Sequence, residues 1–524
     1  MDLQRWLSGA VEAITEWQEG FGPFQADPSM LVSDERFASV FAELTGRLRG
    51  NYPFFHPSYA GQMLKPAHPA AVAGYLAAML INPNNHALDG GPATGQMEKE
   101  AVADLAAMFG LGTHLGHLTT SGTMANLEAL YVARETHPGR GVAYSEEAHY
   151  THARMCGVLG IEGTPVPADG AGRMDPGALD GLLAGGRIGT VVATAGTTGL
   201  GAIDPVHEVL AVARRHGARV HVDAAYGGFF TLLARGDDPP GTSRGPARLP
   251  IPPSLAWPAS RQAPSRELAG RPAARADGQA GTGAAGQAGA GAAGQAGHAD
   301  PGDQAADAFQ PSLDPAPWRA IAECDSVVID PHKHGLQPYG CGAVLFADPE
   351  VGRFYLHDSP YTYFTSDELH LGEISLECSR AGASAAALWL TLRLLPLTPD
   401  GLGRVLAACR RAALDWAALI GESGLLELYQ PPELDIVCYF PQLPGETMSG
   451  IDEASVSMLA RGMKASRPVF LSTLRVTAAG MSRRHPGVKA DRDSARILRS
   501  VLMKPEAQSY VTELHARVEE LAAG

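Results

Sequence analysis

The sequence has little of what marks secreted, membrane-spanning or nucleic-acid-binding proteins. Its six cysteines are scattered through 524 residues with no Cys-x-x-Cys pair, which argues against a secreted disulfide framework and indicates a reduced, cytoplasmic protein. The longest apolar run, residues 70–81, is shorter than the ~20 residues that cross a bilayer, and no export signal is visible, so we expect no membrane partner. A net charge of -15 argues against nucleic acid as a partner.

Glycine and proline are abundant, at 61 and 39 residues, and they concentrate in one segment. Between about 236 and 316 the chain is rich in Pro, Gly, Ala and Gln, and GAAGQAG occurs at 283–289 and again at 291–297. Such a composition buries too little apolar surface to offset its ordering entropy, so we predict a flexible insertion. An arm that docks a partner is the alternative interpretation.

Short apolar, β-branched runs alternate with helical patterns in the middle of the chain. This alternation predicts an α/β fold whose mostly parallel sheet is flanked by helices. The expected strands lie at 190–194, 219–225, 326–330 and 341–346, with two more in the C-terminal part at 435–440 and 468–476.

Three parts follow from this pattern. We expect an N-terminal helical segment at 1–110, a large domain at 111–398 that contains the 236–316 insertion, and a small C-terminal α/β domain at 399–524.

Two segments at predicted strand ends carry reactive side chains. Lys333 follows the strand at 326–330, where desolvation makes a lysine a nucleophilic amine, although most such lysines are merely solvated. Asp223 follows another strand and precedes small residues. It is either a helix cap or a carboxylate that faces the ring nitrogen of a pyridine cofactor, which it would keep protonated.

Two further segments have both an ordinary and a functional interpretation. Ser121, Gly122 and Thr123 form either a helix cap or a phosphate site at a helix N-terminus. His149 is either structural or stacks on an aromatic ring. The pairs His149/His152 and His114/His117 suggest a metal, but they lack cysteines or carboxylates at ligand spacing, so we expect none.

Taken in order, the motifs TSGTMAN, SEEAH, ATAGTTGLGAIDP, HVDAAYGG and DPHK resemble those of one enzyme family. They resemble the pyridoxal 5'-phosphate (PLP) enzymes of fold type I, specifically the group II amino acid decarboxylases, which include aromatic amino acid, tyrosine and glutamate decarboxylases. The resemblance extends from about 53 to 389 without the insertion. It implies PLP as cofactor, an amino acid as substrate and a homodimer.

The resemblance also implies residue roles. Lys333 is then the Schiff-base lysine, Asp223 the partner of the pyridine nitrogen, and His149 and Ala225 cover opposite faces of the ring. The remaining cofactor contacts that it implies are Ser121, Gly122 and Thr123 at the phosphate, Thr198 beside the ring substituents, and His332, which matches the decarboxylases.

The proton donor and the substrate contacts are implied more loosely. Tyr361 and Tyr363 are candidate proton donors to Cα, with packing at a dimer interface as the alternative. His56, Tyr59 and Arg380 are candidate substrate contacts, and for Arg380 a surface ion pair is the alternative.

Two departures from the family pattern stand out. Asp223 and Lys333 are 110 positions apart, where the family has a few tens, and the insertion accounts for the excess. Position 330 is Asp where several animal members have Asn, so Asp330 receives no role.

The predicted function is decarboxylation of an aromatic or acidic L-amino acid to an amine and carbon dioxide. The alternatives are another PLP-dependent reaction at Cα, by an aminotransferase, aldolase or lyase, because one fold serves several reactions, and a non-catalytic scaffold that acts through the insertion.

Overall fold

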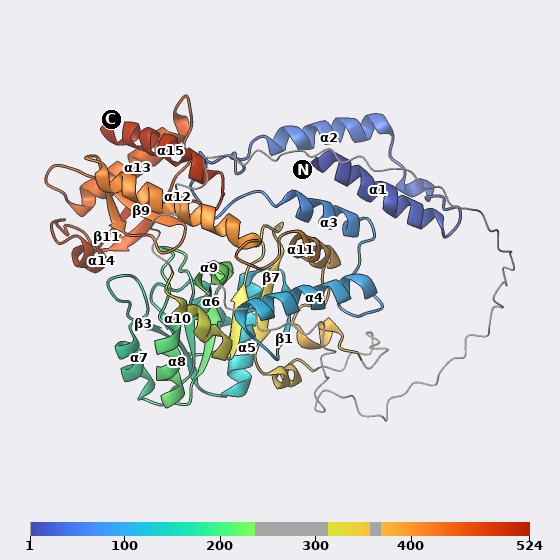
Figure 1. Ribbon diagram of the computed structural model, residues 1–524, viewed down its shortest axis with the longest axis horizontal. Helices are drawn as coiled ribbons and strands as arrows, with labels where there is room; N and C mark the ends of the chain where they lie inside the picture. The colour runs from blue at the N-terminus through green and yellow to red at the C-terminus, as the bar shows by residue number, and fades with distance from the viewer. Residues whose placement is uncertain (1, 236–312, 357–367) are drawn as a thin grey trace, which may run out of the picture. The chain divides into compact units, whose positions relative to one another are not determined.

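The computed structural model describes residues 2–235, 313–356 and 368–524, all of which belong to one unit of packed elements (Figure 1). Its helices are α1 (Leu3–Glu19), α2 (Asp34–Leu48), α3 (Pro69–Met79), α4 (Pro92–Phe109), α5 (Gly122–Thr136), α6 (Thr151–Leu159), α7 (Pro176–Leu183), α8 (Val206–Arg215), α9 (Thr231–Ala234), α10 (Pro315–Ala320), α11 (Gly382–Leu394), α12 (Leu402–Glu422), α13 (Met448–Lys464), α14 (Ala478–Arg484) and α15 (Ala507–Ala523). Its strands are β1 (Leu115–Thr119), β2 (Gly141–Ser145), β3 (Gly163–Val166), β4 (Ile188–Thr194), β5 (Arg219–Asp223), β6 (Ser326–Ile329), β7 (Gly342–Phe346), β8 (Leu426–Gln430), β9 (Ile436–Pro441), β10 (Ser472–Thr477) and β11 (Ser494–Val501).

The larger sheet has seven strands in the order β1-β7-β6-β5-β4-β2-β3. Every strand except β7 runs in the same direction, because β1 and β6 are both antiparallel to β7 and the other pairs are parallel. The prediction of a mostly parallel sheet flanked by helices is confirmed. The carboxyl ends of β1, β2, β4, β5 and β6 therefore lie along one edge of the sheet, where α/β enzymes usually bind their ligands.

Both faces of this sheet are buried, which explains its apolar strands. In β6, Val327 and Ile329 belong to one hydrophobic cluster and Val328 to another, as alternation along a strand requires. α5 packs against β6 and β7 on the Val328 face, and α8 packs against β4 and β5. The runs of Val, Ile and Ala thus build a sheet that is covered on both faces.

The C-terminal residues form a separate four-stranded antiparallel sheet in the order β10-β11-β9-β8. α12, α13 and α15 pack together beside it, and Trp416 of α12 lies against Tyr439 of β9 in a second buried cluster. The two strands predicted here, at 435–440 and 468–476, are present as β9 and β10, whereas β8 and β11 were not predicted. The division of the chain into three domains stays a prediction.

The N-terminal residues are helical, as predicted. α3 packs closely on α11, since a Cβ at Gly74 would lie 3.2 Å from the Ala387 Cα atom, and α4 also packs on α11. α1 packs on α3, yet neither α1 nor α2 contains a buried residue. Across the described ranges, no helix has the length and apolar character required to cross a membrane.

The insertion predicted at 236–316 lies mostly outside the described residues, and its predicted end is wrong. Leu313 is buried, Asp314 caps α10, and α10 begins at Pro315 and buries Trp318. The prediction overlooked a short helix start, in which Asp314 is followed by Pro315 and then an apolar residue. The helix that begins there is buried directly before β6.

Candidate active site

Lys333 lies in a tight turn directly after β6. Its Nζ atom is 3.1 Å from Oδ2 of Asp330, and its backbone N–H donates to the Asp330 carbonyl at 2.8 Å. Leu336 has a φ of 63°, a left-handed conformation that few leucines adopt, and it closes the turn by donating to the Lys333 carbonyl. The amine is therefore held on a rigid turn at the carboxyl end of a buried strand, with 21% of the side chain exposed.

Asp223 ends β5, the strand next to β6, and is buried. His152 Nε2 lies 2.8 Å from its Oδ2 atom, and the Ala225 N–H donates to its Oδ1 atom at 3.1 Å. Burial raises the pKa of the Asp223 carboxyl, but the hydrogen bond and charge of His152, followed by the charge of Lys333, outweigh burial and hold that pKa below its usual range. Asp223 is thus a buried, ionised carboxylate next to Lys333, as the partner of a pyridinium requires.

The turn between β1 and α5 supplies the candidate phosphate site. Ser121 caps α5 by accepting from the Met124 N–H, and the Thr123 hydroxyl lies 3.4 Å from that of Thr151. At Gly122 a Cβ atom would lie 2.7 Å from Oδ2 of Asp330, so the β6 turn approaches this helix end as closely as glycine allows. The first-turn N–H groups of α5 and two hydroxyls therefore face the same edge as Lys333.

His149 and Ala225 flank this edge. His149 follows β2, and its Nδ1 accepts from the Thr151 N–H at 3.3 Å. Burial lowers the pKa of its imidazole, while the charge of Asp223 raises it to a lesser extent. Thr151, whose N–H donates to His149, lies 3.4 Å from Thr123 through its hydroxyl, so the predicted ring-stacking histidine lies near the candidate phosphate site.

Thr198 meets an arginine that sequence reasoning missed. Arg499 of β11 is 4% exposed, and its guanidinium donates to the carbonyls of Thr198 at 2.6 Å and Gly199 at 3.0 Å. It also donates to Oε1 of Gln62 at 3.4 Å, three residues after the candidate substrate contact Tyr59. Within the described ranges these acceptors are all neutral and no ion pair forms, so a buried positive charge sits beside the predicted ring site. Arg499 was missed because it lies in β11, a strand that was not predicted.

The predicted substrate contacts have different surroundings. Tyr59 is buried between Phe54 and Phe470, with the Lys504 ammonium 5.3 Å from its ring centroid. His56 is exposed, bonds Ser58, and packs edge-on against Tyr510 of α15. Their roles toward a substrate stay predictions.

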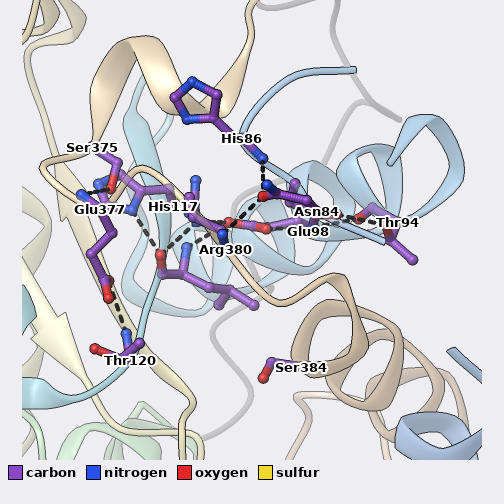
Figure 2. A network of polar contacts seen from close by, with 12 residues as sticks. Asn84, His86, Thr94, Glu98, His117, Thr120, Ser375, Glu377, Arg380 and Ser384 are labelled. Carbon is purple, nitrogen blue, oxygen red and sulfur yellow. Dashed lines mark hydrogen bonds and ion pairs between the residues drawn. The ribbon is translucent and has the colours of Figure 1, made fainter. Parts of the chain in front are cut away.

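Arg380 lies inside a buried polar network (Figure 2). Its guanidinium pairs with Glu98 of α4 and donates to the Leu118 carbonyl of β1, while its backbone N–H donates to the Asn84 side chain. Nearby, the Glu377 carboxylate accepts from the Thr120 N–H, directly before Ser121. Arg380 and Glu98 therefore form a buried ion pair, whereas the alternative interpretation was an ion pair on the surface. None of these contacts supports the predicted contact of Arg380 with a substrate.

His332 directly precedes Lys333 in the turn after β6. His332 Nδ1 donates to the Cys341 carbonyl at 2.7 Å, and its ring lies against Tyr339. Because a carbonyl only accepts, Nδ1 carries the proton. Tyr361 and Tyr363 lie outside the described residues, so their role as proton donors stays a prediction.

Comparisons with known proteins agree with this geometry. Residues 55–238 match the model of a family described as the pyridoxal-dependent decarboxylase conserved domain. An L-tyrosine decarboxylase from Enterococcus faecium is 26% identical over 490 residues, which cover 78% of this chain and 72% of the relative.

The chain is similar to the group II family of pyridoxal-dependent amino acid decarboxylases. A cysteine sulfinic acid decarboxylase from Homo sapiens is 32% identical to this decarboxylase over 243 residues, 42% of the chain and 49% of the relative. Two crystal structures share its fold over nearly their whole lengths. Mouse CSAD has a TM-score of 0.68 and 19% identity over 99% of this chain and 98% of its own, and Oryza sativa TDC with PLP and tryptamine has 0.69 and 18% over 100% and 98%. The fold is therefore fold type I.

PLP is the cofactor of this decarboxylase, and the residues at the sheet edge fit it. A primary amine, a buried carboxylate, an imidazole and a helix N-terminus match the aldehyde, ring nitrogen, ring face and phosphate of PLP in chemical type. The Oδ1 atom of Asp330 is buried without a hydrogen-bond partner among the described residues, next to Gly122, which fits a site that a ligand completes.

Proposed function

We propose that this decarboxylase converts an L-amino acid with an aromatic or acidic side chain into the amine and carbon dioxide, with Lys333 and Asp223 as its central residues. The observation that carries the proposal is their placement at the ends of the neighbouring strands β6 and β5, facing the N-terminus of α5. An amine, a carboxylate and a phosphate site in this order are what a PLP enzyme needs.

Each residue has a distinct task in this account. The Lys333 amine would hold PLP, and the Asp223 carboxylate would keep a proton on the ring nitrogen. His149 and Ala225 confine the ring between them. The phosphate is held by Ser121, Gly122, Thr123 and the first-turn N–H groups of α5, with Thr198 beside the ring and His332 beside the lysine.

The protein selects the reaction by orientation. When bound, PLP supplies an electron sink for the pair of electrons that remains as carbon dioxide leaves. The chain must hold the bond between Cα and the carboxylate perpendicular to the ring, and then deliver a proton to Cα. Tyr361 and Tyr363 stay the candidate donors for that proton.

Arg499 supports a substrate with a carboxylate. Among the described residues the Arg499 guanidinium has neutral acceptors, which makes its burial costly, and an anion beside Thr198 would pair with it. The relatives are named for tyrosine, aspartate and cysteine sulfinate, which are aromatic or acidic substrates. His56, Tyr59 and Arg380 stay candidate contacts for the side chain.

We also propose a cytoplasmic homodimer. All six cysteines are free thiols, as a reducing compartment would leave them. α1 and α2 expose large apolar side chains and bury none of their own residues, and a second copy of the chain would cover them. The exposed apolar residues of these helices are Trp6, Val11, Trp17, Phe37, Val40, Phe41, Leu44 and Leu48.

The test is carbon dioxide release by the purified holoenzyme with L-tyrosine, L-aspartate, L-glutamate and cysteine sulfinate. We expect stoichiometric carbon dioxide and amine with at least one of them, and release at the no-enzyme background for Lys333→Ala. Lys464→Ala, which changes an exposed lysine at the end of α13, is the matched control and should match the wild type. Turnover of the amino acid without carbon dioxide would instead establish another reaction at Cα.

A further inference from the structure

We propose that His152 is a positioning residue that fixes the Asp223 carboxylate in place and keeps it ionised opposite the ring nitrogen of PLP. This inference rests on the function proposed above, and it assigns to His152 a task that the five motifs do not contain. His152 lies in the first turn of α6, three residues after His149, and its side chain is fully buried.

The geometry leaves Asp223 little freedom. His152 binds Oδ2 and the Ala225 N–H binds Oδ1, so one donor comes from α6 and the other from the residues that follow β5. Two donors on different oxygens fix both the position and the plane of a carboxylate. The orientation of Asp223 is thus set before any cofactor binds.

The hydrogen bonds determine the tautomer of His152. A carboxylate only accepts, so Nε2 carries a proton. Nδ1 is buried and has no hydrogen-bond partner among the described residues, so a second proton there would be an unsatisfied buried donor. Nε2 is therefore the donor to Asp223, and His152 supports the carboxylate through this hydrogen bond.

Asp223 depends on this hydrogen bond because the carboxylate is buried. Burial alone raises the pKa of its carboxyl, and the largest opposing effect is the hydrogen bond from His152. The other groups that face Asp223 are Lys333, which lowers that pKa further, and the imidazoles of His149 and His221. Lys333 is the residue that would be bonded to the cofactor, so the hydrogen bonds from His152 and the Ala225 N–H are the contacts of Asp223 that do not involve the cofactor.

Loss of His152 should therefore shift a proton from the ring nitrogen to Asp223. The carboxyl would bind that proton more strongly, and the ring would withdraw electrons less well. This weakens the chemical step, while the substrate contacts stay in place. A change in kcat with little change in KM is the expected signature.

The experiment compares His152→Phe and His152→Gln with the wild-type holoenzyme. We expect His152→Phe to lower kcat about 10-fold or more, corresponding to one unit or more in the pKa of Asp223, with KM within about 2-fold. The acid limb of the kcat profile should move to higher pH, the visible band of bound PLP should change, and PLP affinity should fall. Gln offers an N–H donor of similar reach and should restore part of each property.

His117 provides the matched control. It is also fully buried, and its Nε2 lies 2.9 Å from Oε2 of Glu128 in α5, so His117→Phe breaks a similar pair that does not involve Asp223. Both Phe variants should lose stability, but only His152→Phe should move the acid limb and the visible band. Equal shifts in both variants, or an unchanged profile and band in His152→Phe, would overturn the proposal.

Two readouts separate this inference from the proposed function. If wild-type protein binds no PLP or releases no carbon dioxide, the proposed function fails in the wild type itself. If wild-type protein does both and the His152 variants match it, only the inference fails. PLP affinity by fluorescence titration needs no turnover, and should His152→Phe not fold, His152→Gln against His117→Gln gives the same comparison.

Discussion

Nε2 of His334 lies 2.8 Å from Oδ2 of Asp435, so the residue directly after Lys333 is bound to the residue directly before β9 of the C-terminal sheet. Asp435 also accepts from the Tyr226 hydroxyl, and His334 Nδ1 donates to the Tyr226 carbonyl at 3.0 Å. All three side chains are buried, and Tyr226 follows Ala225 in the chain. The lysine turn, the residues after β5 and the C-terminal sheet are thus joined by one carboxylate.

Asp435→Ala should destabilise the protein strongly. It leaves His334 and the Tyr226 hydroxyl without their buried acceptor, at a cost of about 3 to 5 kcal/mol in the free energy of unfolding, measured by urea denaturation. Asp435→Asn should cost less, because its amide can donate to His334 Nε2 while its oxygen accepts from Tyr226. Equal losses in the two variants would show that hydrogen bonding is not the cause.

Arg380→Leu should also destabilise, through Glu98. The variant leaves a buried carboxylate without its cation, and we expect about 3 to 5 kcal/mol in the free energy of unfolding. The double variant Glu98→Leu/Arg380→Leu should recover part of the loss. Arg393→Leu, which breaks exposed pairs with Glu100 and Asp104, is the control and should cost about 0 to 1 kcal/mol. A higher KM for Arg380→Leu at unchanged stability would instead favour a substrate contact.

Stability should fall as the solution becomes acidic, in part through His221. Burial lowers the pKa of His221 to about 3, and its neutral ring bonds Asn126 and Ser326. The unfolded chain binds this proton below pH ~6.5 and the folded chain does not until near pH 3, so the stability present above pH ~6.5 is lost as the pH falls between these values. Urea unfolding from pH 7.5 to 4.5 should show a slope smaller by about one proton in His221→Gln. An unchanged slope would mean that His221 is not the cause.

The proposed homodimer predicts an effect of two exposed phenylalanines. Phe37 and Phe41 of α2 are 63% and 52% exposed, and their rings stack with centroids 5.8 Å apart. Phe37→Ser/Phe41→Ser should lower the mass measured by light scattering from two chains to one and leave the far-ultraviolet circular dichroism unchanged. Val158→Ser, at an apolar residue of α6 that is 66% exposed, should stay dimeric. A wild-type monomer would contradict the homodimer.

The sequence predicts the apolar strands better than the strands of mixed composition. β4, β5, β6 and β7 are apolar because both faces are covered, whereas β8 and β11 contain Glu, Gln, Arg and Ser and give no clear alternation. Arg499 was missed with β11. Long-range pairing explains the other omissions, since His152 and Asp223 are 71 positions apart and only the fold brings them together.

The candidate site was also predicted only in part. Motifs at strand ends identify Lys333, Asp223, His149 and the turn at 121–123, because parallel strands bring their carboxyl ends to one edge. The surroundings that decide each residue's protonation come from other elements and were not predicted. Arg380 illustrates this, since nothing local in CSRAG indicates its pairing with Glu98.

The most direct test of the account is to find which lysine carries PLP. Holoenzyme would be treated with borohydride, which reduces the bond between the lysine nitrogen and the cofactor to a stable amine, and digested for mass spectrometry. We expect the modification on Lys333 in the peptide that contains Asp330 and His334, and no modification in Lys333→Ala. A modified Lys65, Lys99 or Lys504 in the wild type, or no modified lysine, would contradict the assignment of Lys333.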